Sequence, residues 1–181
     1  MNWLLVALLL TPSFAGKKRV VKRDEAPDGF QELVVRAVLP RPGGAVVILT
    51  DEDEEKVLHM VVGQSEGQTI FFRLERRAFE RPLTHDLFDQ VLGFAQTRVV
   101  DVRIDDVRAD TFVARVTVET KKRKRHTLDA RASDSIAMAL GRGLPIYFAD
   151  HVVEQMAMDP GELLKQPDDH EPDVDDPHDA L

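Results

Sequence analysis

Hydrophobic and polar residues alternate through the middle of the chain, in the pattern of half-exposed strands. Val100, Val102 and Ile104 are separated by charged residues, and residues 112–119 repeat this alternation. Strict alternation along a whole strand favours an antiparallel sheet that has one solvated face. After a basic turn, residues 126–130 are predicted to form a third strand of this group.

The N-terminal part of the chain shows valine-rich segments that also predict strands. Residues 32–39 and 44–50 flank Pro40-Arg41-Pro42-Gly43-Gly44, a turn sequence that favours a hairpin. Further strands are expected at residues 57–62 and 144–148.

Apolar residues at helical spacing predict four helices, at about residues 65–77, 84–95, 133–142 and 150–158. Polar residues are expected to cap three of the helix starts: Thr84, Ser133 and Asp150. Gly143 stands where a glycine commonly ends a helix. Together these elements predict a single α+β domain, with a mostly antiparallel sheet and interleaved helices.

The two ends of the chain differ from this pattern. Residues 4–10 are an apolar run followed by Ser13-Phe14-Ala15, which together predict a signal peptide at residues 1–15. The run is shorter than the roughly 20 residues of a membrane span, so no stable span is expected. We therefore expect a bacterial protein exported to the periplasm or secreted. The alternative is a cytoplasmic protein whose start is misassigned.

Charge is also unevenly distributed. The net charge is −8, and the residues from Gln166 onward contribute seven acidic residues without any Lys or Arg. We predict a basic linker at residues 16–29, the folded domain at 30–160 and an acidic disordered tail at 161–181. The absence of cysteine from the sequence excludes disulfides, zinc–thiolate sites and thiol nucleophiles.

Residues able to carry out chemistry gather in two segments. The first joins a predicted strand to a helix and contains Asp129, Arg131 and Asp134; the second contains His85 and Asp86. Carboxylates can hold Mg²⁺ or a related divalent metal, a histidine can transfer a proton, and an arginine can bind phosphate. The same residue types also stabilise helix starts, so both interpretations stay open.

A basic turn offers a candidate nucleic-acid-binding surface. Five adjacent cations can track phosphates, or can simply be a solvated turn: Lys121, Lys122, Arg123, Lys124 and Arg125. The chain has only one Trp and one Tyr, so it offers few aromatic side chains of these types on which bases could stack. Sequence-specific readout of nucleic acid is therefore not expected.

Three segments, in this order, resemble the bifunctional nuclease domain family. They are Gly63-x-x-Glu66-x-x-x-Ile70, then Arg81-Pro82-Leu83-Thr84-His85-Asp86-Leu87, and then residues 129–137 with Pro145-Ile146-Tyr147. The resemblance covers roughly residues 33–156. Two positions depart from the family pattern, which usually has proline at Ala132 and alanine at Ser135. The resemblance implies an α+β fold, nuclease activity on RNA and DNA, and a homo-oligomer, but it supplies no assigned catalytic set.

The sequence therefore supports two hypotheses of different classes. The first is a metal-assisted nuclease of low sequence specificity acting on RNA, DNA or both. Its candidate catalytic residues are Asp129, Arg131, Asp134, His85 and Asp86, with Asp129 and Asp134 as candidate metal ligands. The second is a non-catalytic oligomeric scaffold or binding module of the cell envelope, in which these polar residues only join helix starts.

Overall fold

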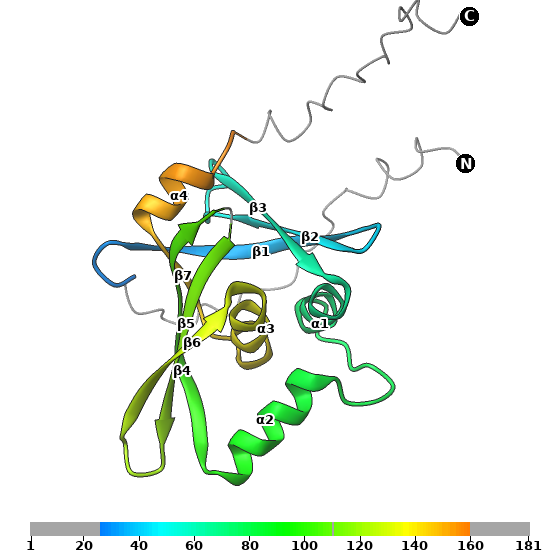
Figure 1. Ribbon diagram of the computed structural model, residues 1–181, viewed down its shortest axis with the longest axis vertical. Helices are drawn as coiled ribbons and strands as arrows, with labels where there is room; N and C mark the ends of the chain where they lie inside the picture. Colours follow the sequence, from blue (N-terminus) through cyan, green and yellow to red (C-terminus); the bar gives the residue numbers. More distant parts are fainter. Residues whose placement is uncertain (1–25, 110, 160–181) are drawn as a thin grey trace, which may run out of the picture.

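The computed structural model describes residues 26–109 and 111–159 (Figure 1). The predicted signal peptide, most of the predicted basic linker and the predicted acidic tail lie outside the described residues. The strands in the described part are β1 (Phe30–Arg41), β2 (Gly44–Thr50), β3 (Val57–Gly63), β4 (Thr97–Arg108), β5 (Thr111–Thr120), β6 (Arg125–Arg131) and β7 (Ile146–Ala149). The helices in that part are α1 (Gln64–Leu74), α2 (Thr84–Phe94), α3 (Ala132–Arg142) and α4 (Asp150–Met156).

These strands form one sheet in the order β3-β2-β1-β7-β4-β5-β6. Every neighbouring pair is antiparallel except β4 and β7, which are parallel. The first residues of β1 pair with β7 and its later residues pair with β2, so one long strand connects the two parts of the sheet seen in Figure 1. The predicted α+β fold with a mostly antiparallel sheet is confirmed.

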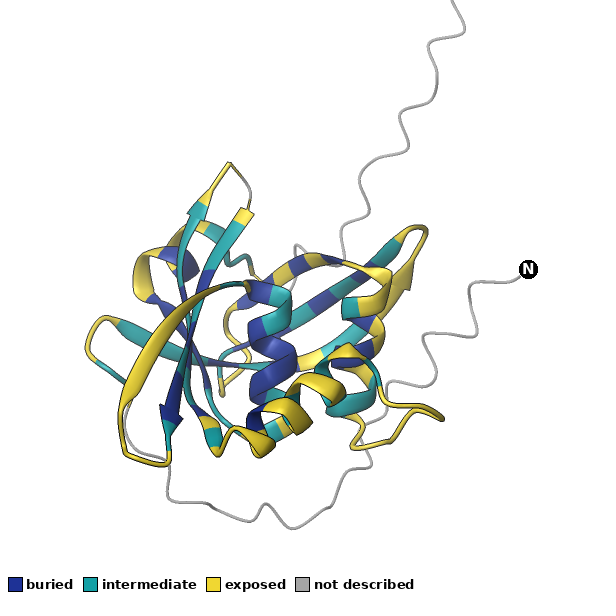
Figure 2. Ribbon diagram, turned by 60° about the horizontal axis from the view of Figure 1, so that its bottom comes forward, coloured by how far each residue is buried: buried dark blue, intermediate teal, exposed yellow. Residues whose placement is uncertain are grey.

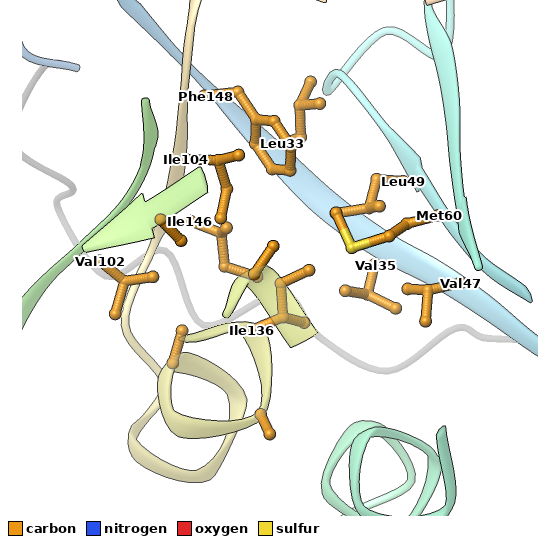
Figure 3. Packing of buried hydrophobic residues seen from close by; sticks show 14 of the residues in the cluster. Leu33, Val35, Val47, Leu49, Met60, Val102, Ile104, Ile136, Ile146 and Phe148 are labelled. Carbon is orange, nitrogen blue, oxygen red and sulfur yellow. The ribbon is translucent and has the colours of Figure 1, made fainter. Parts of the chain in front are cut away.

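The core lies between the sheet and the helices, as the alternation along the strands requires. Figure 3 shows Ile136 of α3 beside side chains of the central strands, among them Ile104 and Phe148, all three of which are fully buried. Gly67 of α1 allows a close approach to β2, because a Cβ atom at this position would lie 2.6 Å from the Cβ of Ala45. In Figure 2, α3 is the most deeply buried helix, whereas β6 is exposed.

The predicted helix caps are wrong. Thr84, Ser133 and Asp150 lie inside their helices, and the residues at the N-cap positions are Leu83, Arg131 and Ala149, none with a side-chain cap hydrogen bond. At α2 the carboxylate of Asp86 instead accepts a hydrogen bond from the Leu83 backbone N–H, at 2.9 Å. At α2, a first-turn carboxylate therefore forms the kind of contact that was predicted for the cap residue Thr84. The predicted end of α3 at Gly143, which has a φ of 64°, is confirmed.

Two further helix features differ from expectation. Helix α1 ends at Leu74 rather than near Arg77, and Arg76 adopts a φ of 52°, which no helix accommodates. The apolar residues of α2 do not all enter the core: Leu92 is buried, but Leu87, Val91 and Phe94 are exposed.

Among the described residues we find no helix with the length and hydrophobicity needed to cross a bilayer.

Candidate functional site

The first turns of three helices contribute side chains to one polar cluster. Glu66 comes from α1, His85 from α2 and Asp134 from α3, while Arg131 occupies the N-cap position of α3. Strand β3 leads directly into α1 and β6 leads directly into α3, and these two helices pack against each other. This topology brings together residues that are more than 60 positions apart. We call these four residues the junction cluster.

Arg131 is the centre of the junction cluster. Its Nε and Nη2 atoms donate to the two carboxylate oxygens of Asp134, at 2.7 and 3.0 Å, in a bidentate pair. Nη2 also donates to Glu66 Oε1 at 2.6 Å, and the hydroxyl of Ser65 donates to the other oxygen of Glu66. A guanidinium carries five N–H groups. The two on Nη1 take no part in these bonds, so they are free to bind another anion.

His85 forms a hydrogen bond with the Asp134 carboxylate of this ion pair, and this bond orients the imidazole ring. Its Nε2 atom is 3.0 Å from Asp134 Oδ1. Because an ionised carboxylate only accepts hydrogen bonds, Nε2 must carry the proton. The other ring nitrogen, Nδ1, is buried and has no hydrogen-bond partner among the described residues. The His85 side chain is 12% exposed and that of Arg131 is 66% exposed, so the cluster runs from a buried imidazole to a solvated guanidinium.

Both carboxyl groups of the junction cluster are held in the ionised form. Burial raises the pKa of Asp134, but hydrogen bonds and charge from Arg131 outweigh burial and leave this pKa below its ordinary value. A backbone N–H and the Arg131 side chain lower the pKa of Glu66. At neutral pH two carboxylates therefore surround one guanidinium. This arrangement can orient an imidazole for proton transfer and present a cation to a phosphate.

Asp86, a predicted site residue, belongs to a second cluster whose contacts are structural. Arg73 of α1 donates to Asp86 and to Asp89 of α2, each at 2.9 Å, and to the carbonyl of Ala137 in α3 at 2.8 Å. Arg142 of α3 donates to Asp89 at 2.8 Å. The Arg73 side chain is only 9% exposed. Since these bonds join three helices to one another, we call this set the helix-joining cluster.

Asp129 and the basic turn form no hydrogen bond or ion pair with the junction cluster in the described part of the chain. Asp129 is exposed on β6, opposite Arg115 of β5. The turn, residues 121–125, lies at the other end of β6. Within residues 26–109 and 111–159, no three His, Asp or Glu side chains are grouped so as to hold a metal ion. The assignment of Asp129 to catalysis or metal binding thus remains a prediction.

Sequence reasoning missed four members of these clusters: Glu66, Arg73, Asp89 and Arg142. Glu66 stands in the first of the three family-like segments, which was its only signal, and no local pattern indicates that it meets Arg131. Arg73 lies in the last turn of α1, where a basic residue is common because it interacts favourably with the helix dipole. Nothing in the sequence therefore indicated that this side chain is buried.

The model of the bifunctional nuclease domain matches residues 47–160 of this chain. Proteins from two strains of Mycobacterium tuberculosis, both described as uncharacterized, are each 34% identical to it over 115 residues. Each alignment covers 62% of this chain and 66% of the relative, slightly less than two thirds of that protein's length. The matched region includes every residue of the junction and helix-joining clusters. The chain therefore belongs to the bifunctional nuclease domain family.

Proposed function

We propose that this protein is a nuclease that hydrolyses phosphodiester bonds of RNA or DNA with low sequence specificity, and that the junction cluster is its active site. One observation supports this most strongly: an imidazole oriented by a carboxylate lies next to a solvated guanidinium that retains free N–H groups. Phosphodiester hydrolysis needs a proton acceptor for the attacking oxygen and a cation for the charge that develops on the phosphate.

Each residue has a distinct role in this proposal. The Nη1 group of Arg131 binds the phosphate oxygens, and its other N–H groups remain on Asp134 and Glu66. Asp134 fixes the His85 tautomer, which leaves the Nδ1 lone pair as the proton acceptor. Because Nδ1 is buried in the free protein, the first turn of α2 must shift when substrate binds so that a water or hydroxyl reaches this atom.

The proposal does not require the divalent metal that the sequence predicted, and whether cleavage needs one is a question for the assay. Glu66 and Asp134 are the two carboxylates of the junction cluster, and the guanidinium of Arg131 is already hydrogen-bonded to both of them. The residues as arranged therefore do not form a resident metal site, and we derive no step through a metal. Addition of EDTA to the assay decides whether cleavage requires a divalent cation.

Substitution of His85 by asparagine tests the proposed function. We expect cleavage of labelled RNA or DNA by the purified protein, and a rate about 10²–10⁴ lower for His85→Asn, since the general base is lost. His126→Asn is the matched control, because His126 is exposed on β6. Initial rates on RNA, single-stranded DNA and duplex DNA, with and without EDTA, provide the measurement. Absence of cleavage under every condition would instead favour the scaffold hypothesis.

We also infer that a second copy of the chain packs against α2. The helix exposes Leu87, Val91 and Phe94 at positions i, i+4 and i+7, and Phe94 is 89% exposed. One apolar stripe of this kind can pair with its own copy about a two-fold axis.

Light scattering coupled to size-exclusion chromatography tests this contact. We expect the wild-type protein to elute as an oligomer and Phe94→Glu to shift it toward the monomer. Leu39→Glu, which alters an exposed residue of β1, should leave the mass unchanged. A wild-type monomer, or an unchanged mass for Phe94→Glu, would refute the α2 contact.

A further inference from the structure

A buried carboxylate near the basic turn is surrounded by three arginines. Glu119 of β5 is 4% exposed. Its Oε1 atom accepts hydrogen bonds from Arg98 at 2.8 Å and from Arg123 at 3.0 Å, and Oε2 accepts one from Arg125 at 3.2 Å. Arg98, Glu119 and Arg125 are adjacent across β4, β5 and β6, so the sheet register itself places them together. We call these four residues the guanidinium cluster.

The guanidinium cluster holds more positive charge than Glu119 requires. One arginine would neutralise the carboxylate, yet three converge on it, which leaves a net charge of +2. The three arginine side chains are 61%, 77% and 67% exposed, so most of their N–H groups face solvent. The hydrogen bonds from the arginines lower the pKa of Glu119 to about 2, and the carboxylate therefore stays ionised. Three exposed lysines add to this charge: Lys121, Lys122 and Lys124.

Strand β6 connects the guanidinium cluster to the junction cluster. Arg125 and Arg131 are its first and last residues and lie on one face by the alternation of the strand, with Thr127 and Asp129 between them. Six residues of strand span about 20 Å. One strand of a DNA duplex rises about 3.4 Å per nucleotide, so this distance corresponds to about six nucleotides. A bound strand can therefore reach both clusters at once.

We propose that the guanidinium cluster is a docking site for the phosphodiester backbone of nucleic acid, organised by Glu119. Fixed guanidiniums bind phosphate oxygens with less loss of side-chain freedom than lysines, because their planar donor groups are already oriented. The proposal rests on the proposed function only in taking the bound strand to be the substrate. Binding itself requires no cleavage.

Nucleic-acid binding by Glu119→Gln tests this proposal. The substitution removes a negative charge, which by itself would strengthen binding to phosphates, but it also removes the anion that holds the three arginines in place, which would weaken binding. We expect weaker binding, whereas Asp106→Asn, which adds the same charge beside Arg108 at the far end of β4, should not weaken it. The measurement is fluorescence anisotropy of a labelled single-stranded oligonucleotide of mixed sequence, with full-length protein in EDTA, at several salt concentrations.

Arg98→Ala gives a second test that does not depend on replacing a buried residue. We expect an affinity loss on the order of tenfold and a salt slope reduced by about one. Arg108→Ala is the matched control, since it removes another largely exposed arginine from the same strand.

Three outcomes would overturn the proposal. They are equal effects of Arg98→Ala and Arg108→Ala, tighter binding by a folded Glu119→Gln protein, and competition by polyglutamate as strong as that by unlabelled oligonucleotide. The last result would identify the cluster as a site for acidic peptides. Binding without cleavage would support the docking site and count against the proposed nuclease, so the two failures are distinguishable.

Discussion

Replacement of Arg131 by alanine is expected to lower kcat/KM for phosphodiester cleavage by about 10²–10³-fold, the usual loss when a transition-state donor is removed. The guanidinium is the solvated member of the junction cluster and retains free N–H groups for phosphate. It also fixes Asp134, which in turn orients His85. The variant therefore loses a phosphate contact and the alignment of the proton acceptor together.

Two variants separate these effects from unfolding. Arg131→Lys keeps the charge but cannot form the bidentate pair with Asp134, so we expect activity well below that of wild type. Arg108→Ala, an exposed arginine outside the cluster, should retain full activity. The Arg131 side chain is largely exposed, and surface ion pairs contribute about 0–1 kcal/mol, so circular dichroism should show a folded protein. Wild-type activity in Arg131→Ala would remove this residue from the mechanism.

Replacement of Arg73 by alanine is expected to reduce the free energy of unfolding by about 2–4 kcal/mol, the largest stability effect we predict. The buried guanidinium holds α2 and α3 to α1. Its loss leaves the Ala137 carbonyl without this donor and removes one partner each from Asp86 and Asp89, which keep only the Leu83 N–H and Arg142. The two carboxylates are partly exposed, so we expect somewhat less than the roughly 3–5 kcal/mol lost when a fully buried ion pair is broken. Urea unfolding followed by circular dichroism measures the change.

Arg36→Ala is the matched control for the loss of an arginine. Arg36 pairs with Glu54 and also donates to the Thr50 hydroxyl and the Glu52 carbonyl. Because both ionic side chains are substantially exposed, we expect a smaller change than for Arg73→Ala, of about 1 kcal/mol. Equal effects of the two substitutions would show that the helix-joining cluster contributes no more than a surface ion pair. Arg73 does not belong to the junction cluster. The Arg73→Ala protein should therefore still cleave nucleic acid under conditions in which it remains folded.

The fold was largely predictable because its signals are local. Val102 and Ile104 alternate with charged residues, and both fall on the buried face of β4, as a period of two requires. Helix starts were less predictable, since Thr84 and Ser133 are good caps by residue type. In the structure, the first-turn carboxylates form the contacts at both starts: Asp86 bonds to the Leu83 N–H, and Asp134 pairs with Arg131.

The candidate site was only partly predictable because its contacts connect distant segments. His85, Arg131 and Asp134 were selected by residue type, and the structure brings them together. Glu66 joins them through the packing of α1 against α3, which no periodicity encodes. Asp129 was selected as a neighbour of Arg131, and the alternation of β6 does put the two on one face. The Arg131 guanidinium nevertheless bonds to Asp134 and Glu66 rather than to Asp129, a choice of partners that sequence proximity does not encode.

The central claim is that the junction cluster cleaves nucleic acid, and its most direct test compares Asp134→Asn with Asp129→Asn. The measurement is the initial rate at which each purified, folded variant degrades labelled RNA and single-stranded DNA, with wild type in parallel. We predict that Asp134→Asn loses about 100-fold or more, because His85 and Arg131 lose their shared carboxylate, and that Asp129→Asn stays near wild type. Equal rates for wild type and Asp134→Asn would contradict the assignment.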